Sequence, residues 1–217
     1  MISTGLTGLD KLLGGGIKSG TITDIFGPSG SGKTQLAMQI CLNCLHEDNI
    51  ILYQDTTGAF RPERMMQLIK LKGIEPSHLD KVIVARITNT SEQIKYVKKI
   101  SQLKPRLVVI ENITDLFTFE YSKESSSLEK HMRFMEYMHM LSMMSVQSKI
   151  PIVITNMVHS SNDHEIENLE KSISIFTHIK IRLEKQAQKN KAYVLPSFGE
   201  EKEISYKITE SGLVEIP

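Results

Sequence analysis

Residues Gly27-Pro28-Ser29-Gly30-Ser31-Gly32-Lys33-Thr34 decide the fold, because they fit the pattern G-x-x-x-x-G-K-[ST] in full. Glycines let the backbone curl so that successive amide groups point at phosphate oxygens. The Lys33 ammonium can reach the β- and γ-phosphates, and the Thr34 hydroxyl can ligate magnesium. A chance Gly/Ser loop is the alternative, but the stretch lies between an expected strand at 21–26 and an expected helix at 33–47. It therefore predicts a P-loop that binds ATP and Mg2+, with all eight residues at the nucleotide.

Short apolar runs alternate with longer helical patterns along the rest of the chain. Further strands are expected at 50–53, 82–86, 107–110 and 150–155, and helices from near Pro62, at 90–103 and at 126–148. Thr90-Ser91-Glu92-Gln93 has the pattern of a capping box at the start of the second of these helices. Alternating strands and helices favour right-handed crossovers and a mainly parallel sheet flanked by helices.

The C-terminal part of the chain has a different period. Residues 179–184 and 204–208 alternate apolar with polar side chains, as in a strand that has one face in water. We expect residues 174–217 to add antiparallel strands to the edge of the sheet. No repeat or long linker divides the 217 residues, so a single α/β domain is expected over 1–217.

The composition is that of an ordinary globular protein, with 40% apolar and 24% charged residues. A formal net charge of +1 falls short of the basic footprint of a dedicated nucleic-acid binder, so local patches would have to attract DNA. No apolar run approaches the ~20 residues of a membrane span. The first five residues also lack the charged and apolar regions of a signal peptide. We therefore expect a cytoplasmic protein without a membrane partner.

A second acidic position is expected at the end of an apolar strand near the P-loop, where a carboxylate can hold a magnesium-bound water. Leu107-Val108-Val109-Ile110-Glu111 meets this description, with Glu in place of the commoner Asp. The extra methylene shifts the reach of the carboxylate. We expect Thr34 and Glu111 to form the metal site; an incidental glutamate at a strand end is the alternative.

Three further stretches resemble the RecA family. Ser3-Thr4-Gly5 and Leu13-Gly14-Gly15-Gly16 resemble the opening of the RecA-family core, which recombinases and KaiC-like ATPases share. Phe60-Arg61-Pro62-Glu63-Arg64 resembles the archaeal and eukaryotic recombinase branch, and Ile154-Thr155-Asn156 resembles the strand end before its second DNA-binding loop. The resemblance covers nearly the whole chain. It implies a RecA-like P-loop ATPase core, and it adds Arg64 to the nucleotide-binding residues.

The resemblance also implies a function. The chain begins at the ATPase core, so the N-terminal DNA-binding domain and linker of full-length recombinases are expected to be absent. This arrangement resembles archaeal RadB and similar recombinase paralogues. We therefore expect an ATP-binding recombinase paralogue that assists homologous recombination and DNA repair. Its expected partners are DNA, bound weakly and without sequence preference, and the main recombinase or another paralogue.

Two departures from the family pattern concern hydrolysis. Recombinases carry a glutamate directly after the Asp-Thr dipeptide, where it activates the attacking water, and Thr57 stands there in this chain. A threonine hydroxyl is a very poor base, and general-base assistance is typically worth ~10²–10⁴ in rate. Met157 replaces the glutamine that links the γ-phosphate to the DNA loop. The resemblance thus implies a slow ATPase at most, and we assign no catalytic residue.

The DNA-binding loops implied by the resemblance are also altered. The first, at 117–127, lacks the arginines of the family, and the second, at 158–172, holds four acids, Asp163, Glu165, Glu167 and Glu170, against one Lys171. Few cations are available there to release counterions from DNA.

Two basic stretches could compensate. One lies on an expected helix and its exit and comprises Lys95, Lys98, Lys99, Lys104 and Arg106; a solvated polar face explains it better. The other flanks a hairpin that could project from the sheet, and it is the expected DNA site, comprising Lys180, Arg182, Lys185, Lys189 and Lys191.

Two alternative functions remain. One is an active DNA-dependent ATPase in which Glu63, Glu111 or a partner's residue replaces the missing base. The other is a KaiC-like regulatory ATPase that acts on protein partners only.

Overall fold

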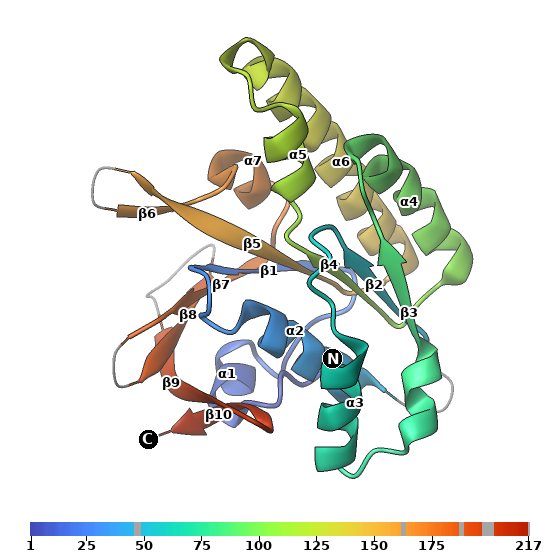
Figure 1. Cartoon of the computed structure of the whole chain (residues 1–217), viewed down its shortest axis with the longest axis vertical. Coiled ribbons are helices and arrows are strands. Elements are labelled where there is room, and N and C mark those ends of the chain that lie inside the picture. Colours follow the sequence, from blue (N-terminus) through green and yellow to red (C-terminus); the bar gives the residue numbers. More distant parts are fainter. Residues whose placement is uncertain (46–48, 162–163, 187–188, 197–201, 217) are drawn as a thin grey trace.

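The computed structural model describes residues 1–45, 49–161, 164–186, 189–196 and 202–216 (Figure 1). The strands within these ranges are β1 (Ile22–Gly27), β2 (Ile51–Asp55), β3 (Val82–Arg86), β4 (Leu107–Glu111), β5 (Ile152–Ser161), β6 (His164–Glu167), β7 (Ile179–Glu184), β8 (Asn190–Pro196), β9 (Lys202–Thr209) and β10 (Gly212–Ile216). These ten strands form one sheet in the order β10-β9-β8-β7-β1-β5-β4-β2-β3, with β6 paired to β5.

Helices cover both faces of this sheet. The described helices are α1 (Thr7–Leu12), α2 (Lys33–Cys44), α3 (Pro62–Leu71), α4 (Thr90–Leu103), α5 (Asp115–Glu120), α6 (Ser127–Ser148) and α7 (Glu170–Ser174), with short 3-10 turns at Pro76–Lys81 and Glu124–Ser126. In Figure 1, α1, α2 and α3 lie below the sheet, and α4, α5, α6 and α7 lie above it. The helix expected at 33–47 corresponds to α2, and its expected end at residue 47 lies outside the described residues.

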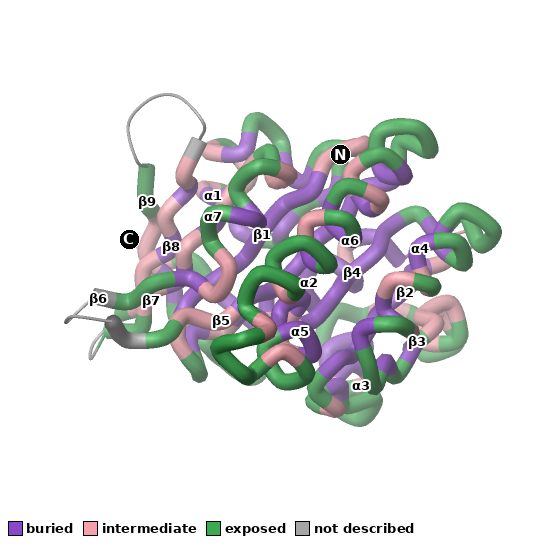
Figure 2. The backbone as a smooth tube through the Cα atoms, turned by 90° about the horizontal axis from the view of Figure 1, so that it is seen from above, coloured by how far each residue is buried: buried purple, intermediate pink, exposed green. Residues whose placement is uncertain are grey.

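Each face has its own apolar core. The core beneath the sheet packs α2 and α3 against the strands and includes Ala192, Tyr206 and Leu213 from the C-terminal strands. The core above the sheet includes Phe117 and Tyr137, whose ring centroids lie 5.8 Å apart. Figure 2 shows the buried residues running along the central strands. The sequences of these strands are nearly continuous apolar runs because helices cover both faces of the strands.

The six strands from β7 to β3 along this order run parallel, and β8, β9 and β10 are antiparallel to their neighbours. The expected α/β fold, a RecA-like core with a mainly parallel sheet and C-terminal antiparallel strands, is confirmed. One part of the prediction was wrong, because β7 pairs parallel with β1 rather than antiparallel. The chain passes through α7 between β6 and β7. Such a crossover returns the chain to the end of the sheet where β1 begins, so that β7 can run parallel to β1.

The predicted start of α4 also needs correction. The cap of α4 is Asn89 rather than Thr90: its side chain accepts a hydrogen bond from the Glu92 amide, and Glu92 accepts one from the Thr88 amide. The cap is therefore one residue earlier than expected, and Glu92 accepts from the amide before the cap rather than from the cap's own amide, as it would in a capping box.

The two expected DNA loops contain regular structure. Residues 117–127 include the end of α5 and a 3-10 turn, and Phe117 is fully buried against Phe134. Residues 158–172 form most of the β5–β6 hairpin and the start of α7; Asp163 lies outside the described residues. No helix in the described part of the chain is long and apolar enough to cross a membrane.

Candidate nucleotide and metal site

The loop between β1 and α2 has the backbone that its glycines predict. Gly32 is the residue before α2 and has a φ of 99°, in the left-handed region that favours glycine. Gly27 lies against β7, where an added Cβ would be 2.2 Å from the Leu183 carbonyl oxygen. A side chain at either position would therefore disturb the loop that leads into α2.

The Lys33 side chain is folded back onto the loop. Its ammonium donates hydrogen bonds to the carbonyl oxygens of Gly27 at 2.7 Å and Pro28 at 2.8 Å. Burial lowers the pKa of Lys33 to about 8, although the carboxylates of Glu111 and Glu165 act in the opposite direction. The cation is thus held at the loop by two neutral oxygens, and a phosphate would offer it a stronger partner.

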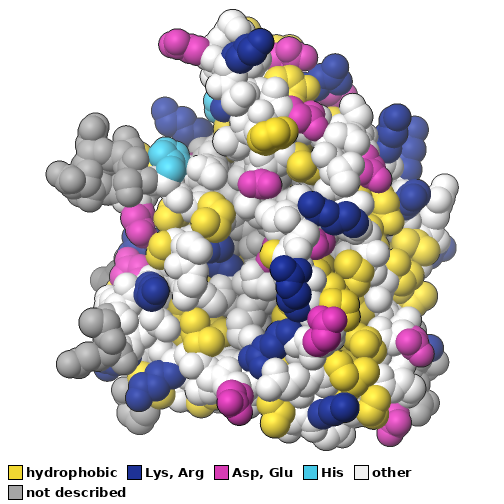
Figure 3. All heavy atoms as spheres, in the orientation of Figure 1, with side chains coloured by type: hydrophobic (Ala, Val, Ile, Leu, Met, Phe, Trp, Pro, Cys, Tyr) yellow, Lys and Arg dark blue, Asp and Glu magenta, His cyan; other side chains and the backbone are white. Residues whose placement is uncertain are grey.

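A cavity of about 420 Å³ lies beside this loop. The P-loop residues that line it are Ser29, Gly30, Gly32, Lys33 and Thr34. Gly27 and Pro28 contribute the carbonyls that hold Lys33, and the carbonyl of Ser31 accepts a hydrogen bond from the Tyr206 hydroxyl at 2.5 Å. On the face seen in Figure 3, Lys and Arg side chains gather near the middle, and others lie toward the outline.

Glu111 ends β4 at the floor of the cavity and is 4% exposed. Both of its carboxylate oxygens accept hydrogen bonds from hydroxyl groups: Thr34 donates to one, and Tyr53 donates to the other at 2.6 Å. Hydroxyl and carboxylate oxygens are the hard ligands that Mg2+ prefers, and this ion usually takes one or two of them together with substrate phosphates. The donor set at Thr34 and Glu111 therefore fits a magnesium-bound nucleotide.

The loop after β2 is ordered by the carboxylate of Asp55. That carboxylate accepts hydrogen bonds from the backbone amides of Thr57, Gly58, Ala59 and Phe60, at 2.7 to 3.2 Å. The Arg86 guanidinium lies 3.6 Å from the same group. The turn places Thr57 in the wall of the cavity, and Met157, from β5, lines it as well. Both departures from the recombinase pattern thus face the same space.

Arg64 reaches the cavity from α3. Its Nε and Nη2 atoms donate to Gln35 Oε1 at 3.1 and 2.8 Å, and Nη1 donates to Gln67 Oε1 at 2.6 Å. A longer contact of 3.4 Å joins Nη2 to the Thr209 carbonyl oxygen at the end of β9. The structure therefore brings Arg64, the P-loop and Glu111 around one cavity.

The basic residues of the C-terminal strands are not gathered in the same way. The Lys180 ammonium, on a side chain only 13% exposed, is paired with Glu167 and lies 3.6 Å from the buried Asp24. Burial, with Glu167 as a further cause, raises the pKa of Asp24 well above its ordinary value. Lys180 holds two buried carboxyl groups together, a structural role that the sequence did not suggest. We leave it out of the proposed DNA contacts.

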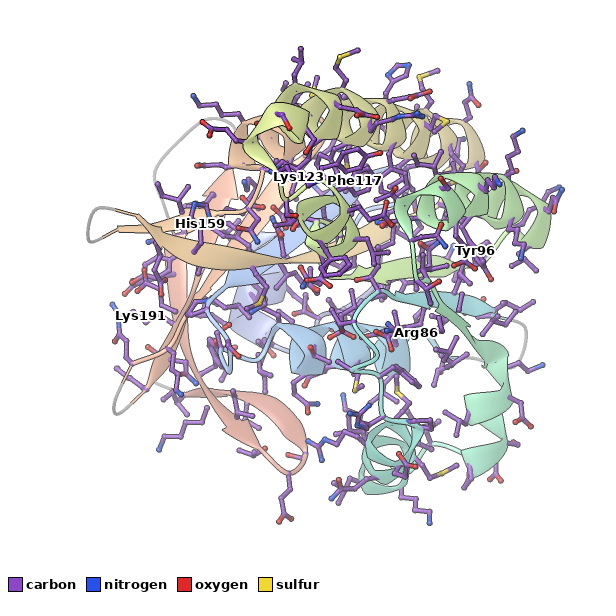
Figure 4. All side chains as sticks on the ribbon, turned by 45° about the horizontal axis from the view of Figure 1, so that its top comes forward. Arg86, Tyr96, Phe117, Lys123, His159 and Lys191 are labelled. Atoms are coloured by element: carbon purple, nitrogen blue, oxygen red, sulfur yellow. The ribbon has the colours of Figure 1, made fainter. Side chains whose placement is uncertain are left out.

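The other four cations lie nearer the surface. Arg182 contacts Glu184 at 3.1 Å and lies over the Tyr193 ring, and Lys191 contacts Glu203 at 2.8 Å. Lys185 is exposed, and its ammonium would lie 3.7 Å from a Cβ added at Gly30, the apex of the P-loop. Lys189 is exposed as well. Figure 4 shows Lys191 at one side of the molecule and Tyr96, on α4, at the other.

Sequence reasoning missed two tyrosines of the site, one that contacts Glu111 and one that contacts the P-loop. Tyr53 shares a strand face with Asp55, so the two-residue period of a strand could have suggested that it points toward the site. Tyr206 lies on β9, far from the P-loop in sequence, and no local pattern indicates its hydrogen bond to Ser31.

The fold and the cavity together define a P-loop nucleotide-binding protein with a RecA-like core. The Rad51 family model matches residues 1–216, and the chain belongs to the Rad51 family. This confirms the resemblance found in the sequence. A RecA-family core implies nucleotide binding, generally with Mg2+.

Two similar proteins are the DNA repair and recombination proteins RadB of Pyrococcus horikoshii and Pyrococcus abyssi. They are 33% and 31% identical over 98% and 99% of this chain, which covers 93% and 94% of their lengths. The DNA repair and recombination protein RadA of Cenarchaeum symbiosum is 34% identical over 75% of this chain. The match covers 44% of that RadA and 54% of the RadA of Ignicoccus hospitalis, about half the length of each.

Proposed function

We propose that this protein is an ATP-binding recombinase paralogue that assists homologous recombination and DNA repair, and that it hydrolyses ATP slowly or not at all. The observation that carries the proposal is the composition of one cavity. Five residues of a complete P-loop motif line it together with Thr57 and Met157, which stand where recombinases have a glutamate and a glutamine. The residues that bind nucleotide are thus retained, and those that speed hydrolysis and link it to DNA are replaced.

Nucleotide binding would use the residues already gathered at the cavity. The P-loop amides and the Lys33 ammonium would hold the phosphates, Thr34 and Glu111 would hold magnesium, and Arg64 would contact the nucleotide from the facing wall. Magnesium would neutralise part of the phosphate charge. Thr57 can donate a hydrogen bond to water but does not accept its proton at neutral pH, so the bound ATP would be long-lived.

The RadB and RadA relatives are named for DNA repair and recombination, and this supports DNA as a partner. We place the contact on the exposed side chains of Lys185 and Lys189 and on the half-buried Lys191. Glu184 and Glu203 lie among these cations and reduce the local positive charge. Binding should therefore be weak, independent of sequence and only shallowly dependent on salt. The main recombinase or another paralogue is the protein partner that the family favours.

Two measurements on the wild-type protein test the proposal. Titration calorimetry with ATP and Mg2+ should show binding, and steady-state turnover should be slow and nearly equal with and without single-stranded DNA. Brisk DNA-stimulated turnover would favour the active DNA-dependent ATPase, with Glu63, Glu111 or a partner's residue as the base. Absence of DNA binding at low salt, with ATP binding intact, would favour a KaiC-like regulator of protein partners.

The metal site needs a separate variant, Glu111→Gln. It should weaken ATP binding in the presence of Mg2+ more than binding measured in chelator, because the amide is a poorer ligand than the carboxylate. Equal effects in both conditions would make Glu111 a structural residue.

A further inference from the structure

Tyr53 is a buried residue of β2 whose hydroxyl group contacts Glu111, a residue that lines the cavity. The side chain is fully buried, and its ring packs on Phe60 with the centroids 4.7 Å apart. Its hydroxyl donates a hydrogen bond to Glu111 Oε2 at 2.6 Å. Val109 is the β4 partner of Tyr53, and Glu111 lies two residues further along β4, on the same face of the sheet. The register of two central strands therefore fixes the tyrosine beneath the carboxylate.

Glu111 has one more side-chain torsion than the aspartate that is commoner at this position. In this structure its two oxygens are held by two different donors, Thr34 and Tyr53. The Thr34 hydroxyl can give a lone pair to a magnesium ion and still donate its proton to Glu111. The hydrogen bond from Tyr53 does not involve the P-loop, so it holds the other oxygen independently of the metal. One oxygen of Glu111 is thus fixed by Tyr53, and the oxygen beside Thr34 is the one that would face the metal.

The hydroxyl of Tyr53 is well suited to this role. It is a neutral donor whose single proton points at Glu111 Oε2. With its proton directed at Glu111, it offers the metal no competing negative oxygen.

We propose that Tyr53 is a positioning residue of the magnesium site: it holds one oxygen of the Glu111 carboxylate so that the other, beside Thr34, serves the metal, and so compensates for the longer side chain. The inference rests on the proposed metal role of Glu111. It assigns Tyr53 a role in metal affinity in addition to its packing in the core.

Tyr53→Phe tests this, because it removes the hydroxyl and keeps the ring against Phe60. ATP affinity would be measured by titration calorimetry across a range of Mg2+ concentrations and in chelator. The Mg2+ concentration that gives half of the maximal gain in ATP affinity should rise several-fold. The ATP affinity measured in chelator should stay unchanged. Equal loss in both conditions would mean that Tyr53 only supports the fold, and the inference would be overturned.

Tyr137→Phe is a matched control, because it also removes a buried tyrosine hydroxyl. Tyr137 lies on α6, in the core above the sheet, and does not line the cavity. It should leave both affinities unchanged. Thermal unfolding of each variant would show that the protein remains folded.

A double-mutant cycle with Glu111→Gln separates the inference from the function on which it rests. If Tyr53 acts through the carboxylate, Tyr53→Phe should have no further effect on the Mg2+ dependence in the Glu111→Gln protein. An unchanged Mg2+ dependence in Glu111→Gln alone would overturn the metal role of Glu111 and this inference with it. A clear effect of Glu111→Gln with none of Tyr53→Phe would overturn only the inference about Tyr53.

Discussion

The P-loop and the C-terminal basic strands differ in how closely their sequence patterns match their three-dimensional arrangement. Around the P-loop, residues from α2, α3 and β4 meet at one cavity, as their motifs predict. Along β7 and β8, five cations that are close in sequence have different surroundings. Lys180 is in a buried ion pair, Arg182 and Lys191 contact carboxylates, and Lys185 and Lys189 are exposed.

The difference follows from what each pattern constrains. A P-loop motif specifies backbone conformation through its glycines, and the ends of parallel strands bring the other site residues to the same edge. A run of lysines and arginines specifies charge only. Where each cation points, and whether a carboxylate from another strand meets it, depends on tertiary pairing. Glu167 lies on β6 and Glu203 on β9, and neither is part of the basic run.

The largest effect that would test this comparison is the loss of DNA binding in a charge-reversal variant. Replacing Lys185, Lys189 and Lys191 by Glu should abolish DNA binding in a fluorescence anisotropy titration at low salt, because phosphate contacts depend on these cations. The matched control reverses Lys95, Lys98 and Lys99, which changes the net charge equally on α4. Retained binding in the first variant, or loss in the control, would move the DNA site to the helix.

Lys180 should behave as a structural residue. Lys180→Ala leaves Asp24 and Glu167 without their shared cation, and breaking a buried pair in this way typically costs about 3–5 kcal/mol of unfolding free energy. Urea denaturation would measure the loss, with Lys185→Ala as a surface control expected to lie within about 0.5 kcal/mol of wild type. A loss below about 1 kcal/mol would show that Lys180 is not needed for folding.

The pH dependence of this variant has a definite sign. The pKa of Asp24 is already raised by burial and by Glu167, and removing Lys180 raises it further. A carboxyl group whose folded-state pKa is raised destabilises the protein as the pH rises and the group must ionise. The deficit of Lys180→Ala should therefore be larger at pH 8 than at pH 5.

At the P-loop, Lys33→Ala should weaken ATP binding at least tenfold, or about 1.4 kcal/mol or more. Among the P-loop residues, Lys33 alone can place a positive charge against the phosphates. Titration calorimetry would measure the change, and Lys95→Ala, on α4 and outside the cavity lining, would serve as the control. Wild-type affinity in a folded Lys33→Ala protein would remove the P-loop assignment.

The sequence predicts most of the fold because strand and helix periods are local properties. β3 and α4 have the expected bounds, and β1, β2, β4 and α6 begin within one residue of the expected positions. The direction of β7 was wrong because it depends on the path through α7. The hydrogen bonds of Tyr53 and Tyr206 were missed because each joins segments that are far apart in the chain.

The smallest expected effect is the recovery of hydrolysis by Thr57→Glu, which adds the missing acid to the cavity. Asp55 fixes the turn that carries Thr57, so a glutamate there would be presented toward the same space. General-base assistance is worth up to ~10²–10⁴ in rate. We expect only a several-fold rise in steady-state turnover, because full assistance requires the carboxylate to be held in an exact geometry relative to the attacking water.

ATP affinity should change little in Thr57→Glu, because binding depends on the P-loop, and Thr57→Gln is the control without a base. Stimulation by DNA should stay weak, since Met157 offers no hydrogen bond to connect the phosphate with the β5–β6 hairpin. Adding Met157→Gln should raise DNA stimulation only when Glu is present at 57, as two residues in the same cavity can couple. Equal turnover in the Glu and Gln variants would show that the missing base does not limit the rate, and attention would pass to Glu63 or to an acid from a partner.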